Sequence, residues 1–508
     1  MRTSILITGI IAGLLFVSCN DLLNIDPADR MTQANIQEMV KKNPEAVLAP
    51  MVTSLVSQVH NYGTGSVNDR NLSILHMRLN YMGNDIVKVK TGWLDEDYRM
   101  RDWRTQISPI VPLFWRNYYA YIFYSNQILV TIPEDMDLTV ATDDNKAIMK
   151  YKATALTLRA FSYTGLMWLY QDDYLHGGKD KAGVPLYTTT TNVARGRASS
   201  AEVWDLIKSD ATEAVRLFKA SDNYMTESRT DIDGSVASVV LARAALTLGD
   251  WQTAISAASD VIAAYPDLFN EAEYTSTGFS LLDKETIFGH EYSSNTSKAQ
   301  SSFPAWMNIY GEGGYGGSQQ TSWMAIDQRL YDRISETDYR KKNFVDEPFE
   351  YIYPVSEQPV TVDKYVQIKF ATTAIRDQTA YNQDEIYMRA SEMYLAKAEA
   401  EARSGNDAAA QNTLYQLVSK RDPEYVKSTQ TGDALFQEIR LHRRIELWGE
   451  AGHEFYDNKR WHIGVDRTGS PNHIEKVQLE AGKFTLQIPL ETEINYNPNI
   501  TEADQNPL

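Results

Sequence analysis

The sequence predicts a mostly α-helical fold, in which helical repeat units form a scaffold and long irregular loops with a few short strands interrupt it. Two observations support this prediction. Residues 235–266 and 386–423 each contain two helix-length segments joined by a glycine-containing turn. Residues 271–383, in contrast, are rich in Gly, Tyr, Trp, Ser and Asp and show little helical period. Loops of this length are usually functional or disordered, and the aromatic content argues against disorder.

The first 18 residues have the pattern of an export signal. Arg2 supplies a positive charge and residues 5–17 are apolar, a run too short to span a bilayer, which needs about 20 residues. Cys19 is the single cysteine of the chain and follows Phe-Val-Ser, which looks like a bacterial lipobox. We therefore expect residues 1–18 to be a lipoprotein signal peptide, Cys19 to carry acyl chains, and residues 19–508 to form the mature protein. An ordinary cleaved signal with an incidental cysteine is the alternative.

Three further helices are expected before the first repeat unit, over residues 110–132, 145–170 and 201–219. Ser199 and Ser200 are suitable caps for the third helix. In the first repeat unit, small residues at Ala242 and Ala245 precede the Gly249 turn, and Pro266 ends the second helix, which matches the ~34-residue tetratricopeptide unit. The chain therefore contains at least two such units.

The charge balance limits the class of partner. The formal charge is −18, and it becomes −19 when Arg2 leaves with residues 1–18. This acidic excess argues against nucleic acid and against anionic lipid as partners. The 30 tyrosines outnumber the 15 phenylalanines, so the aromatic residues favour rings with a polar tip, which suit half-wetted surfaces.

The C-terminal segment 439–461 is expected to form a helix with Leu441, Ile445 and Trp448 on one face. Arg443 and Glu446 are three residues apart and are expected to pair on its solvated face. This segment, the tail at 484–508, the start CNDLLNIDP and the stretch at 386–405 together resemble the SusD/RagB family of outer-membrane lipoproteins of Bacteroidetes. Ala451 and Glu454 depart from the residues common in that family.

The resemblance implies a SusD-like helical scaffold with loops that shape a ligand surface. It also implies a glycan-binding function without catalysis, a position at the cell surface, and a partner, a SusC-like TonB-dependent β-barrel transporter. No cofactor and no metal are expected, since the eight histidines are scattered without ligand spacing.

A glycan site needs flat aromatic rings beside amide, carboxylate or guanidinium groups, and two stretches supply this mixture. The first spans residues 77–103 and the second spans residues 303–323, around a glycine-rich loop. For any single aromatic residue, half-buried packing is about as plausible as ligand contact. The predicted glycan-contacting residues are Arg78, Asn80, Trp93, Trp103, Tyr310, Tyr315 and Trp323.

Three other functions have some support in the sequence: dinucleotide binding, glycoside hydrolysis, and binding of proteins or peptides. Gly311, Gly313 and Gly316 spell the dinucleotide pattern, but Pro304 lies just before them and the residues after them are a poor helix start. A glycoside hydrolase would need two carboxylates about 5 to 9 Å apart in a cleft, and acidic runs such as residues 95–97 are usually solvated. An interaction scaffold, or a binder of peptides with the same architecture, remains the main alternative.

Overall fold

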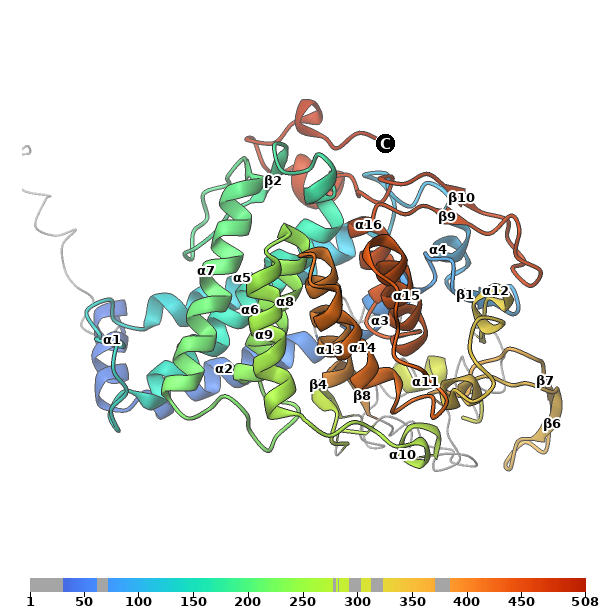
Figure 1. Ribbon diagram of the computed structural model, residues 1–508. Coiled ribbons are helices and arrows are strands. Elements are labelled where there is room, and N and C mark those ends of the chain that lie inside the picture. The colour runs from blue at the N-terminus through green and yellow to red at the C-terminus, as the bar shows by residue number, and fades with distance from the viewer. Residues whose placement is uncertain are drawn as a thin grey trace, which may run out of the picture.

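The structure, a computed structural model, describes residues 31–61, 72–276, 280–281, 283–291, 303–311, 323–370 and 384–508. Its scaffold is a row of antiparallel helices in which each helix packs against the next (Figure 1). The helices of this row are α5 (Val111–Thr131), α6 (Lys146–Tyr170), α7 (Ser200–Ala220), α8 (Gly234–Leu248), α9 (Trp251–Ala264), α13 (Ala390–Arg403), α14 (Asp407–Val418) and α15 (Gly432–Glu446). The predicted mostly α-helical class is thereby confirmed.

The two predicted repeat units are helix pairs, α8 with α9 and α13 with α14. Each pair turns at a glycine in the left-handed region, Gly249 with φ 71° and Gly405 with φ 82°. An acid or amide then caps the second helix: Asp250 accepts from the Thr253 N–H at 3.2 Å, and Asn406 accepts from Ala409 at 3.3 Å. Glycine fits these turns because it has no Cβ to clash, so the local sequence determines where the helices reverse.

Helix α7 begins where the serine pair predicted. Ser199 is the N-cap, and its hydroxyl accepts from the Glu202 N–H at 3.2 Å while Glu202 accepts from the Ser199 N–H at 2.8 Å. This reciprocal capping box satisfies donors that the first helical turn leaves free. At the other end of the scaffold, α1 (Gln33–Lys42) and α2 (Pro44–Asn61) pack on α5 and α6.

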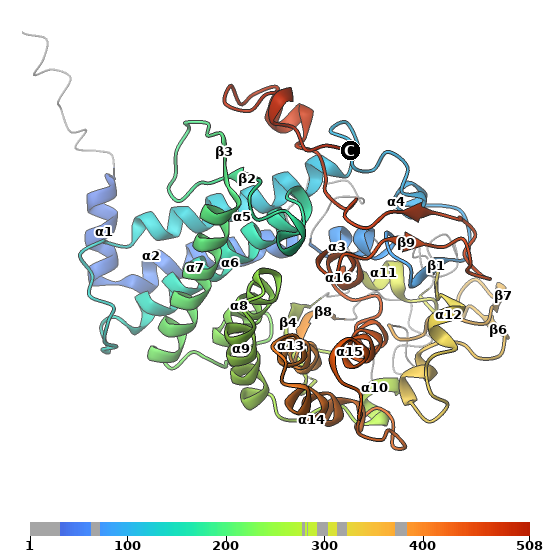
Figure 2. The same ribbon diagram turned by 45° about the horizontal axis from the view of Figure 1, so that its top comes forward.

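Shorter elements complete the fold, and many of them lie beside the end of the helical row that α15 forms (Figure 2). The shorter helices are α3 (Leu72–Asn80), α4 (Asp95–Arg99), α10 (Glu271–Ser276), α11 (Phe303–Met307), α12 (Gln328–Tyr331) and α16 (His453–Arg460), with single turns η1 (Tyr174–His176), η3 (Tyr339–Asn343), η4 (Leu490–Ile494) and η5 (Glu502–Asp504). The strands are β1 (Ile86–Lys88), β2 (Ala182–Pro185), β3 (Arg197–Ser199), β4 (Thr286–His290), β5 (Met324–Ile326), β6 (Phe349–Ile352), β7 (Pro359–Val362), β8 (Glu385–Arg389), β9 (Val465–Asp466) and β10 (Gln478–Leu479). The described parts of the loop-rich region predicted at 271–383 contain several of these elements.

The described strands form two-stranded antiparallel ladders, and two of these ladders join distant segments. β1 pairs with β5 in the register Ile86 to Ile326, and β4 pairs with β8, whose last residue leads directly into α13. The largest apolar core lies among α2 and α5 to α9, and separate cores lie under the short elements and between α13, α14 and α15. Within the described ranges, no helix is both long and apolar enough to cross a membrane.

The prediction of one helix over 439–461 is wrong in one respect, because the structure divides this segment between α15 and α16. Gly449 and Gly452 between them lie in the left-handed region with φ 74° and 71°, and Ala451 joins them at 47°. Ile445 and Trp448 are buried and Leu441 is partly buried against the same core, as the apolar pattern predicted. The chain reverses at the glycines and packs α16 against α3.

Candidate functional site

An open hollow of about 500 Å³ lies beside α4, and we call it the Trp93 hollow. Its lining residues are Arg78, Gly92, Trp93, Leu94, Asp95, Glu96 and Asp97. The Trp93 side chain is 42% exposed, whereas Arg78 is 8% exposed and Asp97 is 2% exposed. The volume falls within the range of roughly 300 to 1,000 Å³ that is typical of small-molecule sites. A flat ring therefore stands at a hollow whose base is charged.

Lys88, the last residue of β1, stabilises the loop that contains Trp93. Its ammonium group is 0% exposed and donates to the Trp93 carbonyl and to the Asp95 carboxylate. Asp95 also accepts from the Gly92 N–H at 3.0 Å. Because β1 is paired with β5, these contacts hold the backbone of residues 92–95, which includes the exposed Trp93.

Helix α4 is bounded by unusual backbone. Leu94 precedes it with φ 62°, Met100 follows with φ 52°, and Asp102 lies close by with φ 48°. Side chains other than glycine are uncommon in this left-handed region, and such residues gather at ligand and active sites, where the surrounding structure holds them in place. The concentration of three of them here supports a functional role for this loop.

The base of the hollow is an ion pair. Arg78 Nε lies 2.9 Å from Asp97 Oδ2, and its Nη2 donates to Oδ1 at 3.2 Å. Burial raises the pKa of Asp97, although Arg78 opposes that shift. Burial likewise lowers the pKa of Lys88 against the effect of Asp95. The lining of the hollow therefore includes a charged pair that is largely withdrawn from water, where hydrogen bonds are electrostatically stronger than in bulk solvent.

The structure brings Trp93 and Arg78 together but places three of the other predicted aromatic residues in the interior. Trp103 is 4% exposed and packs edge-on against Phe455, with ring centroids 5.6 Å apart. Tyr310 and Trp323 are 5% and 2% exposed. The expectation of open rings at Tyr310 and Trp323 is not met, because both rings pack in one apolar core. The ladder of β1 and β5 extends to Trp323, whose carbonyl accepts from the Val89 N–H at 3.0 Å.

Asn80 has a structural role in this arrangement. Its amide donates to the Gly449 carbonyl at 2.8 Å and accepts from the Gly452 N–H at 3.1 Å, so it clamps the turn between α15 and α16. Tyr315 and most of the glycine-rich loop lie outside the described residues, as does Cys19. Asp95 and Asp97 are the residues that sequence reasoning missed, since it treated their acidic run as solvated. The signal that could have identified them is a basic residue earlier in the same stretch. Lys88 lies seven residues before its partner Asp95, and Arg78 lies 19 residues before its partner Asp97.

A second cluster of charge is fully enclosed, and we call it the Glu446 cluster. It comprises Glu285, Arg340, Arg389, Arg421 and Glu446, whose side chains are at most 1% exposed. Three guanidinium groups contact the Glu446 carboxylate, at 2.6 Å for Arg389 and 3.0 Å for both Arg340 and Arg421. Burial opposes the ionisation of Glu446, yet these guanidinium groups hold its pKa well below the usual range.

This cluster overturns the expected pairing of Arg443 with Glu446 on a solvated helix face. Arg443 is buried and pairs instead with Asp457 of α16, at 2.6 Å. The charged face of α15 therefore points into the protein. Its charges are satisfied by residues from η3, β8 and the segment after α14, and they bind these elements together.

A polar hollow of about 470 Å³ lies where the C-terminal tail crosses β2 and β3, and is lined by residues including Asp172, Lys181 and Arg197. The Arg197 guanidinium donates to the carbonyls of Gly183 and Asp504, both at 2.7 Å. Its donors are therefore used to hold the tail. Within the described part of the chain, one group of side chains has the composition of a metal site: Asp173, His176 and His462.

Two family models match the chain. Residues 353–507 match the SusD family, and residues 29–246 match a family described as starch-binding associating with outer membrane. The two ranges do not overlap, and together they show the similarity of this chain to SusD-like proteins. Solved structures agree with the fold. A SusD-like carbohydrate binding protein from Bacteroides vulgatus is 23% identical with a TM-score of 0.75, and the match covers 91% of this chain and 98% of that one.

Another solved structure, a laminarin binding SusD-like protein, is 19% identical with a TM-score of 0.64. That match covers 91% of this chain and 99% of the other. A SusD superfamily protein from Bacteroides thetaiotaomicron is 20% identical with a TM-score of 0.72, over 91% of this chain and 99% of that one. No curated protein matches the chain in sequence.

Proposed function

We propose that this protein is a non-catalytic glycan-binding lipoprotein of the outer-membrane surface. It holds oligosaccharide or polysaccharide at the Trp93 hollow and delivers it to a SusC-like TonB-dependent transporter. Acyl chains on Cys19 anchor the mature chain. The observation that carries the proposal is the half-exposed Trp93, which lines the same hollow as the buried pair of Arg78 and Asp97. The names of the similar proteins, a starch-binding family and a laminarin binder, support it.

The chemistry of the hollow suits a sugar. A pyranose offers an apolar C–H face to the indole ring and a rim of hydroxyl groups to the carboxylates and guanidinium group beneath. Binding at an open surface is weak for each sugar, because ordering a flexible glycan offsets part of the contact energy. A site tethered beside a transporter works at an effective concentration of order mM, so weak binding is sufficient.

The test is retention on a panel of immobilised glycans that includes starch and laminarin. Trp93→Ala is expected to weaken retention at least about 10-fold, which corresponds to ~1.4 kcal/mol. Phe123→Ala is the matched control, because Phe123 is 46% exposed on α5 and lies outside the lining of the hollow. Equal retention by the wild type and Trp93→Ala would place the site elsewhere.

Two outcomes of the retention assay separate the alternatives, and two further experiments test the anchor and the partner. Cleavage products would indicate a glycoside hydrolase, and the absence of retention on every glycan would favour an interaction scaffold or a peptide binder. Cys19→Ala is expected to release the protein from the membrane fraction. Co-purification with a β-barrel transporter from detergent-solubilised membranes checks the proposed partner.

A further inference from the structure

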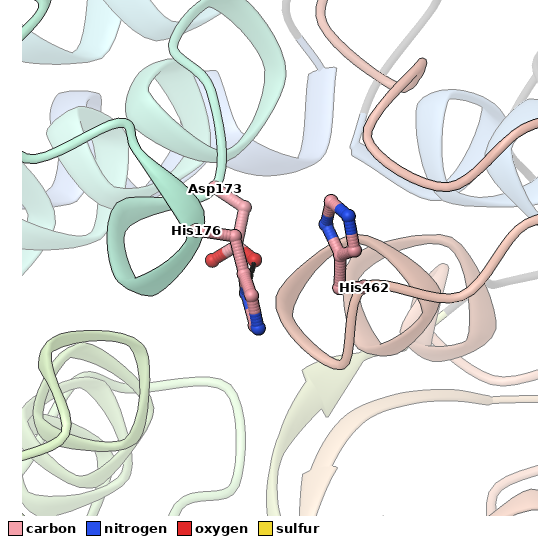
Figure 3. Close-up of side chains that lie close together, drawn as sticks. All are labelled: Asp173, His176 and His462. Carbon is pink, nitrogen blue, oxygen red and sulfur yellow. Dashed lines mark hydrogen bonds and ion pairs between the residues drawn. The ribbon is translucent and has the colours of Figure 1, made fainter.

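Asp173, His176 and His462 meet where the loop after α6 faces the end of α16 (Figure 3). Each residue offers one ligand atom, and these atoms all lie within 4.8 Å of one another. The two imidazole rings are stacked, with centroids 4.5 Å apart and an angle of 21° between their planes. Two histidines and a carboxylate in such proximity form the donor set of many zinc sites.

The Asp173 carboxylate is held in place by its own loop. Asp173 is the N-cap of η1, where its Oδ1 accepts from the Leu175 N–H at 3.2 Å, and the side chain is buried. Its Oδ2 forms a hydrogen bond with Nδ1 of His176. An ion bound by both groups would replace the proton of this hydrogen bond, so the Asp173 oxygen and a ring nitrogen of His176 are positioned to act as a pair of ligands.

His462 occupies a backbone position that favours glycine. The Ile463 N–H donates to the Asn458 carbonyl at 2.8 Å and the His462 N–H donates to Lys459 at 3.0 Å, the pattern of a Schellman motif that ends α16. His462 has φ 54° there. Its ring has room because Gly482 lies against it, where an added Cβ would come within 3.1 Å of Cε1. The helix end therefore gives no backbone reason for a histidine.

We propose that Asp173, His176 and His462 form a binding site for one divalent transition-metal ion, such as Zn²⁺. Imidazole nitrogen favours zinc and its neighbours in the first transition row over Ca²⁺ and Mg²⁺, which prefer oxygen. Zinc–nitrogen bonds of about 2.0 Å place two ligands of a tetrahedral ion roughly 3.3 Å apart. The three donors reach that spacing by rotation of the exposed His176 and His462 rings.

An ion at this position joins two segments that are distant in sequence. Asp173 and His176 belong to the loop between α6 and β2, whereas His462 ends the helix that packs on α3. The side chain of His176 is 38% exposed, which gives the ion a path from solvent. Three protein ligands leave one tetrahedral position for water. The site is separate from the Trp93 hollow, since the two share no lining residue.

The experiment measures Zn²⁺ binding by the mature chain without a polyhistidine tag, in competition with a chromogenic zinc indicator. The wild type is expected to bind one equivalent, and Co²⁺ in its place should give the visible absorption of a tetrahedral nitrogen and oxygen site. His176→Asn and His462→Gly should each weaken binding at least 10-fold. Asp180→Asn, an exposed carboxylate on the same loop, is the matched control and should bind as the wild type does.

His462→Gly also shows whether a loss of Zn²⁺ binding results from unfolding, because this variant is expected to fold normally. Because glycine suits the left-handed position, the metal-free variant should melt at the same temperature as the wild type or higher. Absence of saturable binding of Zn²⁺ and Co²⁺ at micromolar concentrations would overturn the proposal. Equal affinity in the wild type and in either histidine variant would overturn it as well. Neither result bears on glycan retention, which is measured without metal.

Discussion

The Glu446 cluster and the Trp93 hollow contain the same kinds of side chain but differ in access to water. In the Glu446 cluster every carboxylate and guanidinium group is enclosed, and Glu446 alone meets three arginines. In the Trp93 hollow the pair of Arg78 and Asp97 lies at the base of an open space beside an exposed ring. The comparison shows that charge by itself does not mark a ligand site. The first arrangement joins parts of the fold, and the second lines a hollow that is open to solvent.

The largest effect is expected when the enclosed cluster loses its central charge. Glu446→Gln leaves Arg340, Arg389 and Arg421 around a neutral amide, and breaking a buried ionic network in this way costs about 3 to 5 kcal/mol of unfolding free energy. Urea denaturation followed by circular dichroism measures the loss. Glu480→Gln, an exposed glutamate, is the control and should change stability by less than about 0.5 kcal/mol. A loss below about 1 kcal/mol for Glu446→Gln would contradict the structural role of the cluster.

A pair of tryptophans tests the same contrast between enclosed and open positions. Trp103→Ala empties a buried site against Phe455 and should lower the unfolding free energy by about 3 to 5 kcal/mol. Trp93→Ala should change it by no more than about 0.5 kcal/mol while reducing glycan retention. Both are measured by thermal unfolding beside the retention assay. The contrast fails if the two variants are destabilised equally.

A third prediction concerns Glu454, which is buried and accepts from the Asp85 N–H at 3.1 Å. Burial, together with the nearby Asp85 carboxylate, raises the pKa of Glu454 to about 8. The folded protein therefore keeps a proton that the unfolded chain releases above about pH 4.5. The unfolding free energy should fall as pH rises from about 4.5 to 8, and level off above that.

Glu454→Gln removes this titration and imitates the protonated side chain. The decline of the unfolding free energy between pH 5 and 8 should become smaller in this variant by at least about 1.4 kcal/mol, the equivalent of one pKa unit. Urea unfolding at a series of pH values measures it, with Glu480→Gln as the control. Parallel pH profiles for the wild type and Glu454→Gln would show that Glu454 is ionised in the folded protein.

The sequence allowed prediction of those features that depend on near neighbours in the chain. The turns at Gly249 and Gly405 and the cap at Ser199 follow from local backbone preferences, and all three are present. The pairing of Arg443 with Glu446 was predicted by the same local rule and is wrong, because Asp457 and Arg340 compete for these side chains from other elements. Local spacing carries no information about such partners.

The candidate site was only partly predictable for the same reason. The composition of residues 77–103 indicated a ring beside charged groups, and Trp93 with Arg78 fits that description. Composition could not separate Trp93 from Trp103, since exposure depends on which core each ring reaches. Likewise the approach of His176 to His462 depends on how α16 packs, so spacing between histidines along the chain could not reveal it.

The order of synthesis adds a consequence to the make-up of the Glu446 cluster. Its three arginines precede Glu446 in the chain, and the pairing of β4 with β8 also depends on a late segment. A chain still emerging from the ribosome, or one truncated before residue 446, therefore carries three cations without their shared anion. The helices α5 to α9 can pack on their own neighbours before residue 446 is synthesised. We therefore expect the elements joined by the Glu446 cluster to fold last.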